Sequence, residues 1–492
     1  MAAAMRILIL THRYLGIAVG LLMTLWCLSG FVMMYQSFPA LTAAERVRGL
    51  APLQLEDCCD PARIGLADDT ALTEARVEML AGEPVLRLAR SVGPTLAYNL
   101  RTGAPLEELS RDQVSRVARD FAAGAGVRGR PGPPRQIEMD QWTVASAGRN
   151  QPVWKVAFDD PAASAIYVSG SSGQVFMDTT RKERVLGWLG AVPHWLYPTL
   201  LRQNGAVWTQ VVIWSSVVGV FLTVLGIWIG IVRFKRRRNG RWSPYRGLMW
   251  QHHVPGLVFG ALTLTWVFSG LMTMGPWGLF DSAAGQTRRA FAGETTWGEV
   301  RAMLAAAPRL AGPGVVQIEA APLGGTVRLL SVAADGRTGR FDAEGRPAPV
   351  SADELRRAAA ETGASVESLS LMRREDGYYY AHHDPVTLPV WRLVLADAGR
   401  THLYVHPQTG KVLRAVDAPA RTNRWVETSL HDLDFAWIRR RPVWDLVVLP
   451  LLAGVTFVCA TGTWLGFRRV GRDVERLRFA LRRAGAKKRA RA

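Results

Sequence analysis

The chain has 492 residues, of which 49% are hydrophobic, and its 60 Lys and Arg against 41 Asp and Glu give a net charge of +19. This length exceeds that of one compact soluble domain and indicates several structural units. Only 21% of the residues are charged, which excludes a disordered basic protein that binds nucleic acid. The four cysteines are too few for a disulfide scaffold, and none of them forms a Cys-x-x-Cys pair that would offer a zinc or thioredoxin-like site. Metal chemistry would therefore depend on the nine histidines.

Four long apolar segments predict transmembrane helices, at residues 14–35, 206–232, 254–279 and 446–467, and none contains Asp, Glu, Lys or Arg. A bilayer core of about 30 Å is crossed by about 20 helical residues. The alternative, a soluble protein with buried helices, would require four unusually long uncharged helices in one chain. The first segment is longer than the apolar region of a secretory signal, so we expect a retained anchor.

The distribution of Lys and Arg predicts the topology. The connection 233–246 carries seven basic residues and no acidic one, and the tail from residue 468 carries eleven basic residues against two acidic ones. Loops rich in Lys and Arg stay in the cytoplasm. Both termini and the central loop are therefore expected to be cytoplasmic, with two large segments on the outer face. The positive charge is a topology signal and not a nucleic-acid interface.

The chain contains two related halves. The start of the first span aligns with the start of the third, and a Trp precedes a His by six residues before both the second and the fourth span. Matching positions in a repeat have equivalent roles. We therefore expect two copies of one unit, which consists of a helix, an outer domain, a His-bearing segment and a second helix. The matching motifs are His12-Arg-Tyr-Leu-Gly16 with His252-His-Val-Pro-Gly256, Ser29-Gly30 with Ser269-Gly270, Trp188 and His194 with Trp425 and His431, and Gly226-Ile-Trp228-Ile-Gly230 with Gly462-Thr-Trp464-Leu-Gly466.

Each outer segment is expected to fold as a small helix-plus-sheet domain. Apolar residues alternate through pairs of runs that are joined by glycine-containing turns, as in β-hairpins. A short helix that begins with a serine is expected before each pair. The expected helices cover residues 110–122 and 351–362, and the expected strands cover 153–158, 166–175, 390–395 and 403–412.

Several further motifs accompany the two halves. They are the His-x(3)-Gly starts and Ser-Gly ends of the first and third spans, Tyr378-Tyr-Tyr-Ala-His-His383, Leu388-Pro-Val-Trp391, Tyr404-Val-His-Pro-Gln-Thr-Gly410, and Arg424-Trp425 before Leu430-His-Asp-Leu-Asp-Phe435. In these motifs the chain resembles the PepSY-associated transmembrane proteins, a family that includes bacterial inner-membrane ferric-siderophore reductases. The resemblance covers nearly the whole chain and is more specific for the family than for the reaction. One departure is His406-Pro407, where Asp-Pro is more usual.

The expected fold is an integral membrane α-helical protein, with four transmembrane helices in two tandem repeats and two α+β periplasmic domains. The resemblance makes these domains PepSY-like and places the chain in the bacterial inner membrane. The expected order is a cytoplasmic N-terminus (1–13), a first span (14–35), periplasmic domain 1 (36–205), a second span (206–232), a basic cytoplasmic loop (233–253), a third span (254–279), periplasmic domain 2 (280–445), a fourth span (446–467) and a basic cytoplasmic tail (468–492).

Four histidines are candidate axial ligands of haem iron. An electron-carrying haem takes two ligands that stay bound in both oxidation states, and neutral imidazole serves this purpose. His12 and His252 match in the repeat and stand at the inner ends of their spans, whereas His194 and His431 match at the outer ends. We therefore expect two b-type haems, one near each membrane face. The alternative is that these histidines are interfacial residues that contact water.

The assignment at the inner face has an alternative, in which haem is held by His253 and one inner-end histidine instead. His253 lies about 100° around the helix from His252, so the two cannot easily face one iron. We prefer His252 because it keeps register with His12. In the second outer segment, His382 and His383 are candidates for contact with an iron-bearing ligand or the outer haem, and otherwise are ordinary surface or core residues.

The neighbouring cysteines Cys58 and Cys59 can form a vicinal disulfide outside the cytoplasm, and the alternative is two unremarkable thiols. The sequence contains no Gly-x-Gly-x-x-Gly between a strand and a helix and no Walker A, His-Glu-x-x-His or Gly-x-Ser-x-Gly motif. A nicotinamide or flavin site of the Rossmann type is therefore not supported. Electrons are expected from a partner, either a membrane quinol or a cytoplasmic reductase.

The resemblance implies a di-haem electron-transfer protein that reduces ferric iron in siderophores at the periplasmic face. Its expected partners are membrane lipid, a ferric siderophore and the electron donor, with no nucleic acid. The alternative is a non-enzymatic membrane-anchored protein whose outer domains bind or restrain an envelope partner such as a peptidase. A transporter component is less favoured, because coupled pumps use buried carboxylates and the four spans contain none.

Overall fold

The computed structural model describes residues 2–56, 58–91, 93, 95–238, 240–382 and 385–489. Contacts divide the chain into two compact units, and each unit draws on distant parts of the sequence. The first, here called the helix unit, comprises Met1–Phe38, Leu186–Leu279 and Asn423–Ala492. The second, here called the sheet unit, comprises Pro39–Val185 and Phe280–Thr422.

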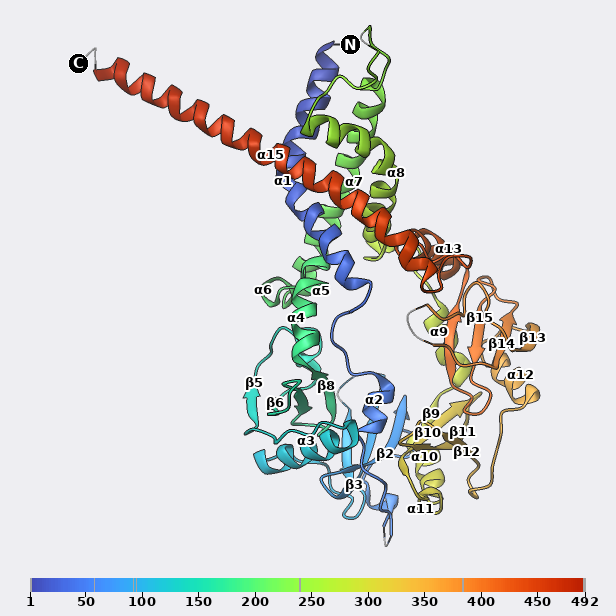
Figure 1. Ribbon diagram of the computed structural model, residues 1–492. Coiled ribbons are helices and arrows are strands. Elements are labelled where there is room, and N and C mark those ends of the chain that lie inside the picture. The colour runs from blue at the N-terminus through green and yellow to red at the C-terminus, as the bar shows by residue number, and fades with distance from the viewer. Residues whose placement is uncertain are drawn as a thin grey trace. The chain divides into compact units, whose positions relative to one another are not determined.

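Within the described residues, four long helices make up most of the helix unit (Figure 1). Each is long and apolar enough to cross a membrane, as the sequence predicts. The first and third helices each pack against both the second and the fourth, so the four form one bundle. They are α1 (Ala2–Met33), α7 (Gly205–Arg233), α8 (Leu248–Met272) and α15 (Val443–Arg489).

The helix ends differ from the expected spans. α1 begins before residue 14 and α15 continues beyond residue 467, because the flanking Arg, Ala and Leu residues favour helix even outside an apolar segment. α8 ends at Met272, seven residues earlier than expected, and Gly275 follows with a φ of 53°. A positive φ breaks the helical path, and Pro276 then begins a short 3₁₀ turn.

Short helices connect the bundle to the rest of the chain. Two of them end in a histidine, and these two pack against α1 and α8 respectively. Their bounds are α4 (Arg181–Leu189), α5 (Ala191–His194), α6 (Thr199–Arg202), α13 (Ala418–Val426) and α14 (Thr428–His431).

Two four-stranded antiparallel sheets in the sheet unit confirm that the two segments expected on the outer face, 36–205 and 280–445 (the outer segments), contain sheet domains. Each is a meander in which consecutive strands pair, and each is accompanied by a helix at the expected place, α3 (Arg111–Ala125) or α12 (Ala352–Ala360). Ser110 and Ser351 cap these helices by accepting a backbone N–H. The strands are β5 (Arg135–Ile137), β6 (Val153–Ala157), β7 (Ala165–Ser169) and β8 (Val175–Thr179), then β13 (Val366–Met372), β14 (Val390–Leu395), β15 (His402–Val405) and β16 (Val412–Val416).

A six-stranded sheet joins the two outer segments, whereas the sequence predicts a separate domain in each. Its order is β12-β11-β10-β2-β3-β4, and Val77 of the first segment pairs with Ile318 of the second. Pairing covers an edge that each hairpin would otherwise expose, and both segments contribute to one apolar core. The strands are β2 (Glu74–Leu80), β3 (Glu83–Ala89), β4 (Leu96–Asn99), β10 (Val315–Leu323), β11 (Thr326–Ala333) and β12 (Thr338–Phe341).

The remaining elements of the sheet unit are short. They are α2 (Ala43–Arg48), η1 (Pro61–Arg63), β1 (Ala71–Leu72), η2 (Ala147–Arg149), α9 (Ala284–Ala292), β9 (Thr295–Thr296), α10 (Trp297–Leu304) and α11 (Ala307–Leu310).

Asp178 makes the stability of the sheet unit depend on pH. Burial on β8, followed by the carboxylates of Glu45 and Glu183, raises the pKa of Asp178 from 3.8 to about 6. Because the folded pKa lies above the unfolded one, ionised Asp178 destabilises the fold, and this penalty develops as the pH rises from about 4 to about 6. We expect Asp178→Asn to stabilise the protein by about 1 kcal/mol at pH 8, a value reduced for the partial exposure of the side chain.

The measurement is the free energy of unfolding of the full-length protein in detergent at pH 4 and pH 8. The gain from Asp178→Asn should be present at pH 8 and absent at pH 4. An equal change at both values would show that the effect does not come from this ionisation.

Candidate functional site

The structure brings the four candidate histidines together as two pairs within the helix unit. The ring centres of His12 on α1 and His252 on α8 are 6.3 Å apart. Those of His194 and His431, at the ends of α5 and α14, are 6.1 Å apart. These are the pairs that the alignment of the two halves indicates.

Both separations suit one metal ion between two imidazoles. A ring nitrogen binds a transition metal at about 2.0–2.1 Å and lies roughly 1.1 Å from its own ring centre, so two axial imidazoles have centres roughly 6.3 Å apart. Among the described residues, no group of three or more His, Cys, Asp or Glu is placed to hold a metal ion. Two protein ligands alone suit a metal whose other ligands come from a macrocycle.

We call His12 and His252 the inner pair, and His194 and His431 the outer pair, after the ends of the spans at which the sequence places them. One nitrogen of each histidine of the inner pair is held by a neighbouring helix. The Nδ1 atom of His12 lies 3.2 Å from the carbonyl oxygen of Leu222 on α7. The Nδ1 atom of His252 lies 3.1 Å from the carbonyl oxygen of Val458 on α15. A carbonyl can only accept, so Nδ1 carries the proton and donates it, which leaves the lone pair of Nε2 for a metal.

The outer histidines are held in the same way, by α1 and α8. The Nδ1 atom of His194 lies 3.0 Å from the hydroxyl of Ser29 and 3.1 Å from the carbonyl oxygen of Trp26. The Nδ1 atom of His431 lies 3.1 Å from the hydroxyl of Ser269. The Ser-Gly motif near the end of each odd-numbered span therefore orients an outer histidine, a role that the sequence analysis missed although the motif was its signal.

The two pairs lie toward opposite ends of the bundle. Ser29 follows His12 by 17 residues on α1, and Ser269 follows His252 by 17 residues on α8. At 1.5 Å per helical residue, the contact of the outer pair is about 25 Å along the helix from the inner histidine. The inner pair is near the basic end of the bundle, where α7 ends at Arg233.

A cavity of about 320 Å³ surrounds the inner pair, and glycines at matching positions of the two halves form much of its wall. A Cβ atom at Gly226 would come within 2.6 Å of Cε1 of His12, and one at Gly462 within 2.9 Å of Cε1 of His252. These glycines therefore allow each imidazole to lie directly against a helix backbone. The glycines of the wall are Gly16, Gly20, Gly226, Gly230, Gly256, Gly260, Gly462 and Gly466.

His253 also lines this cavity, but both of its ring nitrogens have protein partners. Its Nδ1 atom lies 2.9 Å from the hydroxyl of Ser243, and its Nε2 atom lies 3.0 Å from the carbonyl oxygen of Gly230. Both nitrogens are thus engaged in hydrogen bonds to protein groups. The geometry therefore favours His252 over His253 as the partner of His12.

A buried polar network fixes the loop that carries His431. Arg424 is 5% exposed and donates from Nη2 to the carbonyl oxygen of Asp434 at 2.9 Å. The same guanidinium donates to the hydroxyl of Ser429, which in turn donates to the Arg424 carbonyl. The Arg-Trp and Leu-His-Asp-Leu-Asp motifs thus hold one histidine in place, which sequence reasoning had not assigned to them.

The candidate substrate residues lie in the sheet unit. His382 is half-buried in the segment that leads to β14, and His383 is outside the described residues. The tyrosines before them pack inside the unit, because Tyr379 stacks on Tyr404 with ring centres 4.9 Å apart and donates to the Thr387 carbonyl at 3.0 Å. The described contacts give this tyrosine run a structural role.

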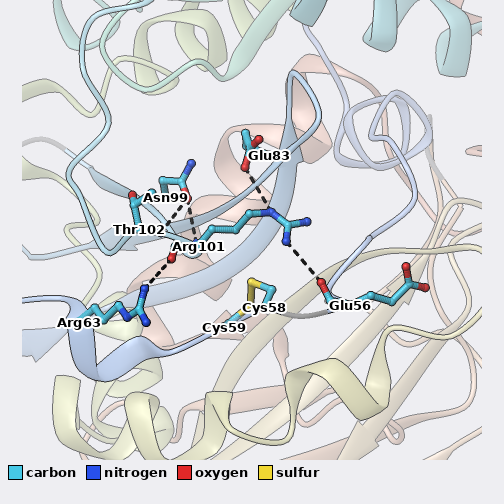
Figure 2. The surroundings of a disulfide bond; sticks show 8 residues. All are labelled: Glu56, Cys58, Cys59, Arg63, Glu83, Asn99, Arg101 and Thr102. Carbon is cyan, nitrogen blue, oxygen red and sulfur yellow. Dashed lines mark hydrogen bonds and ion pairs between the residues drawn. A yellow bond between two sulfur atoms is a disulfide. The ribbon is translucent and has the colours of Figure 1, made fainter.

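Cys58 and Cys59 form a vicinal disulfide with an S–S bond of 2.05 Å, so the first of the two possibilities holds. Figure 2 shows the bond beside Arg101, whose guanidinium lies 3.4 Å from the carboxylate of Glu83 and donates to the Glu56 carbonyl at 3.3 Å. In the helix unit, the free thiols of Cys27 and Cys459 lie 3.8 Å apart.

Comparison with protein families matches residues 9–362 of the chain to the PepSY-associated TM region. The matched part contains His12, His194 and His252, and His431 follows it. Comparison with curated proteins gives no match. The family match covers well over half of the chain and includes three of its four long apolar helices. The chain is therefore a membrane protein of the PepSY-associated transmembrane family.

Proposed function

We propose that the helix unit binds two b-type haems, one at each histidine pair, and carries electrons between the two sides of the membrane. The observation that carries this proposal is the spacing of the pairs. Both ring separations, 6.3 and 6.1 Å, equal within a few tenths of an ångström the value for two imidazoles on one iron. Two independent pairs share this value at opposite ends of one bundle.

The surroundings of the inner pair also fit the proposed group. Haem is a broad flat molecule, and a wall of glycines gives a flat surface that approaches closely to the backbone. Each histidine is fixed through Nδ1, and the hydrogen bond to a carbonyl increases the electron density that the ring offers through Nε2. The residues therefore present two oriented ligands before any metal arrives.

When bound, haem supplies a one-electron carrier whose potential depends on its axial ligands and surroundings. The chain's own contribution would be to hold each group through one histidine pair, His12 with His252 and His194 with His431. Met23 and Leu222 give the cavity of the inner pair an apolar part of its wall. One macrocycle is too small to cross the bilayer core of about 30 Å. Two histidine pairs about 25 Å apart along the helices would place one group near each face of the membrane.

For the acceptor, we propose ferric iron held by a siderophore on the outer side, in line with the expectation from the family. The donor is a quinol or a reductase on the side of the basic loop. Reduction weakens the hold of hard oxygen ligands, because Fe(II) is softer and carries less charge than Fe(III). The basic connection and tail support the cytoplasmic placement of both termini, and the outer pair lies at the other end of the bundle.

The test of the proposed reaction is a rapid-mixing experiment with the full-length protein. Protein reduced by dithionite, with the excess removed, is mixed with a ferric trihydroxamate chelate, and the loss of the reduced visible spectrum is followed. We expect oxidation at least about tenfold faster than in His431→Ala, equivalent to about 1.4 kcal/mol in the barrier. An equal rate in both proteins would contradict reduction through the outer pair and would favour an outer-domain binding role.

A further inference from the structure

Three arginines line the same cavity as the inner histidine pair. Arg13 follows His12 directly on α1. On α15, Arg469 and Arg472 follow Gly466 within two turns. Arg13 and Arg469 are half-buried, and Arg472 is exposed at the mouth. Along α15, the residues that line the cavity therefore change from glycines, Gly462 and Gly466, to arginines, Arg469 and Arg472.

The two arginines of α15 are oriented through Nε. The Nε atom of Arg469 lies 2.9 Å from a carboxylate oxygen of Asp473, and Nε of Arg472 donates to the Arg468 carbonyl at 3.3 Å. Each of these contacts uses the Nε atom of the guanidinium. The two terminal nitrogens of a guanidinium form the fork that binds a carboxylate with two parallel hydrogen bonds.

The arginines occupy one side of the cavity only. The position on α8 that matches Arg13 is His253, and its nitrogens contact Ser243 and Gly230. Among the described residues that line the cavity, every Lys or Arg lies on α1 or α15. The cavity is therefore suited to a flat ligand that carries anionic groups along one edge.

We propose that Arg13, Arg469 and Arg472 form a carboxylate-binding rim that holds the two propionates of the haem between His12 and His252. This inference rests on the proposed function and adds to it the residues that determine which edge of the macrocycle faces the mouth. Phosphates of lipid head groups share this anionic chemistry, and the experiment below separates them from haem carboxylates.

The experiment compares haemin with haemin dimethyl ester, in which both carboxylates are blocked. The full-length protein carries His194→Ala and His431→Ala, so that only the inner pair binds, and binding is followed by the shift of the Soret band. We expect the ester to bind at least about tenfold more weakly than haemin. Arg13→Gln, Arg469→Gln and Arg472→Gln should each weaken haemin binding by up to about tenfold and leave ester binding unchanged.

The matched control is Arg476→Gln, an exposed arginine of the same helix that does not line the cavity. It should bind both ligands as the parent does. Arg472→Lys should recover part of the loss, because it keeps the charge without the fork. Circular dichroism of each variant shows whether it has folded.

Equal binding of haemin and ester by the parent, with no loss in the three Gln variants, would overturn the carboxylate rim and leave the haem site standing. It would assign the arginines to lipid head groups instead. A parent that binds neither compound would contradict the proposed function itself, so the two failures are distinct.

Discussion

Replacing His12 with alanine is expected to remove one haem of two and to leave the other in place. The ring centre of His12 lies 6.3 Å from that of His252, and the Leu222 carbonyl holds the His12 ring through Nδ1, so alanine removes one of the two proposed ligands of the inner site. The outer pair uses different residues and is about 25 Å away along the helix. The haem content per chain, measured by pyridine haemochrome, should therefore fall by half, and His431→Ala should cause the same loss at the outer site.

The matched control is His253→Gln, which removes the neighbouring histidine of the same cavity. Both nitrogens of His253 contact the protein, at Ser243 and Gly230, so the variant should keep both haems. Full haem content in His12→Ala, or loss of one haem in His253→Gln alone, would contradict this assignment of the ligands.

Substituting Gly226 with alanine is expected to disrupt the inner site almost as strongly as loss of the histidine. The new Cβ would lie 2.6 Å from Cε1 of His12, closer than any normal van der Waals contact. The ring must therefore move away from α7, which breaks its hydrogen bond to Leu222 and changes the direction of Nε2. We expect the affinity of the inner site for haem to fall by about tenfold or more, since misplacing a liganding group by about 1 Å has large effects.

Gly462→Ala tests the matching position of the other half, where the Cβ would lie 2.9 Å from Cε1 of His252. The control is Gly471→Ala on α15, because a Cβ there meets no atom within 4 Å. The measurement is the affinity for haem, determined by titration of full-length protein that also carries His194→Ala and His431→Ala. Unchanged affinity in Gly226→Ala and Gly462→Ala would show that the rings do not need their contact with the helix backbone.

Much of the candidate site could be predicted because its signals are local or repeated. A charge-free segment of about 20 residues identifies a span without knowledge of its neighbours. The alignment of the two halves then paired His12 with His252 and His194 with His431, although more than 230 residues separate the members of each pair. The structure places both pairs within one helix unit.

The contacts that hold the histidines could not be predicted, because they depend on how helices pack. The Leu222 and Val458 carbonyls carry no side-chain signal, and any residue type supplies the same group. Gly226 and Gly462 were visible as repeated glycines, but only the packed bundle shows that each one makes room for an imidazole. The role of a residue in such a contact can be recognised only when the position of the contacting residue is known.

The six-stranded sheet was missed for a related reason. The domains that the sequence predicts follow chain order, with one complete domain in each outer segment. The pairing of Val77 with Ile318 connects strands far apart in the sequence, and their alternation of apolar residues fits many partners equally well. The sequence therefore predicts some of the strands, but it does not predict which strand of one segment pairs with which strand of the other.

The most direct test of the central claim is a reduced-minus-oxidised visible spectrum of the detergent-purified protein, produced with haem available. Pyridine haemochrome quantification on the same sample gives the haem count per chain. The account predicts a b-type spectrum and about two haems per chain, one for each histidine pair. A folded protein that contains no haem under these conditions would contradict the electron-transfer function.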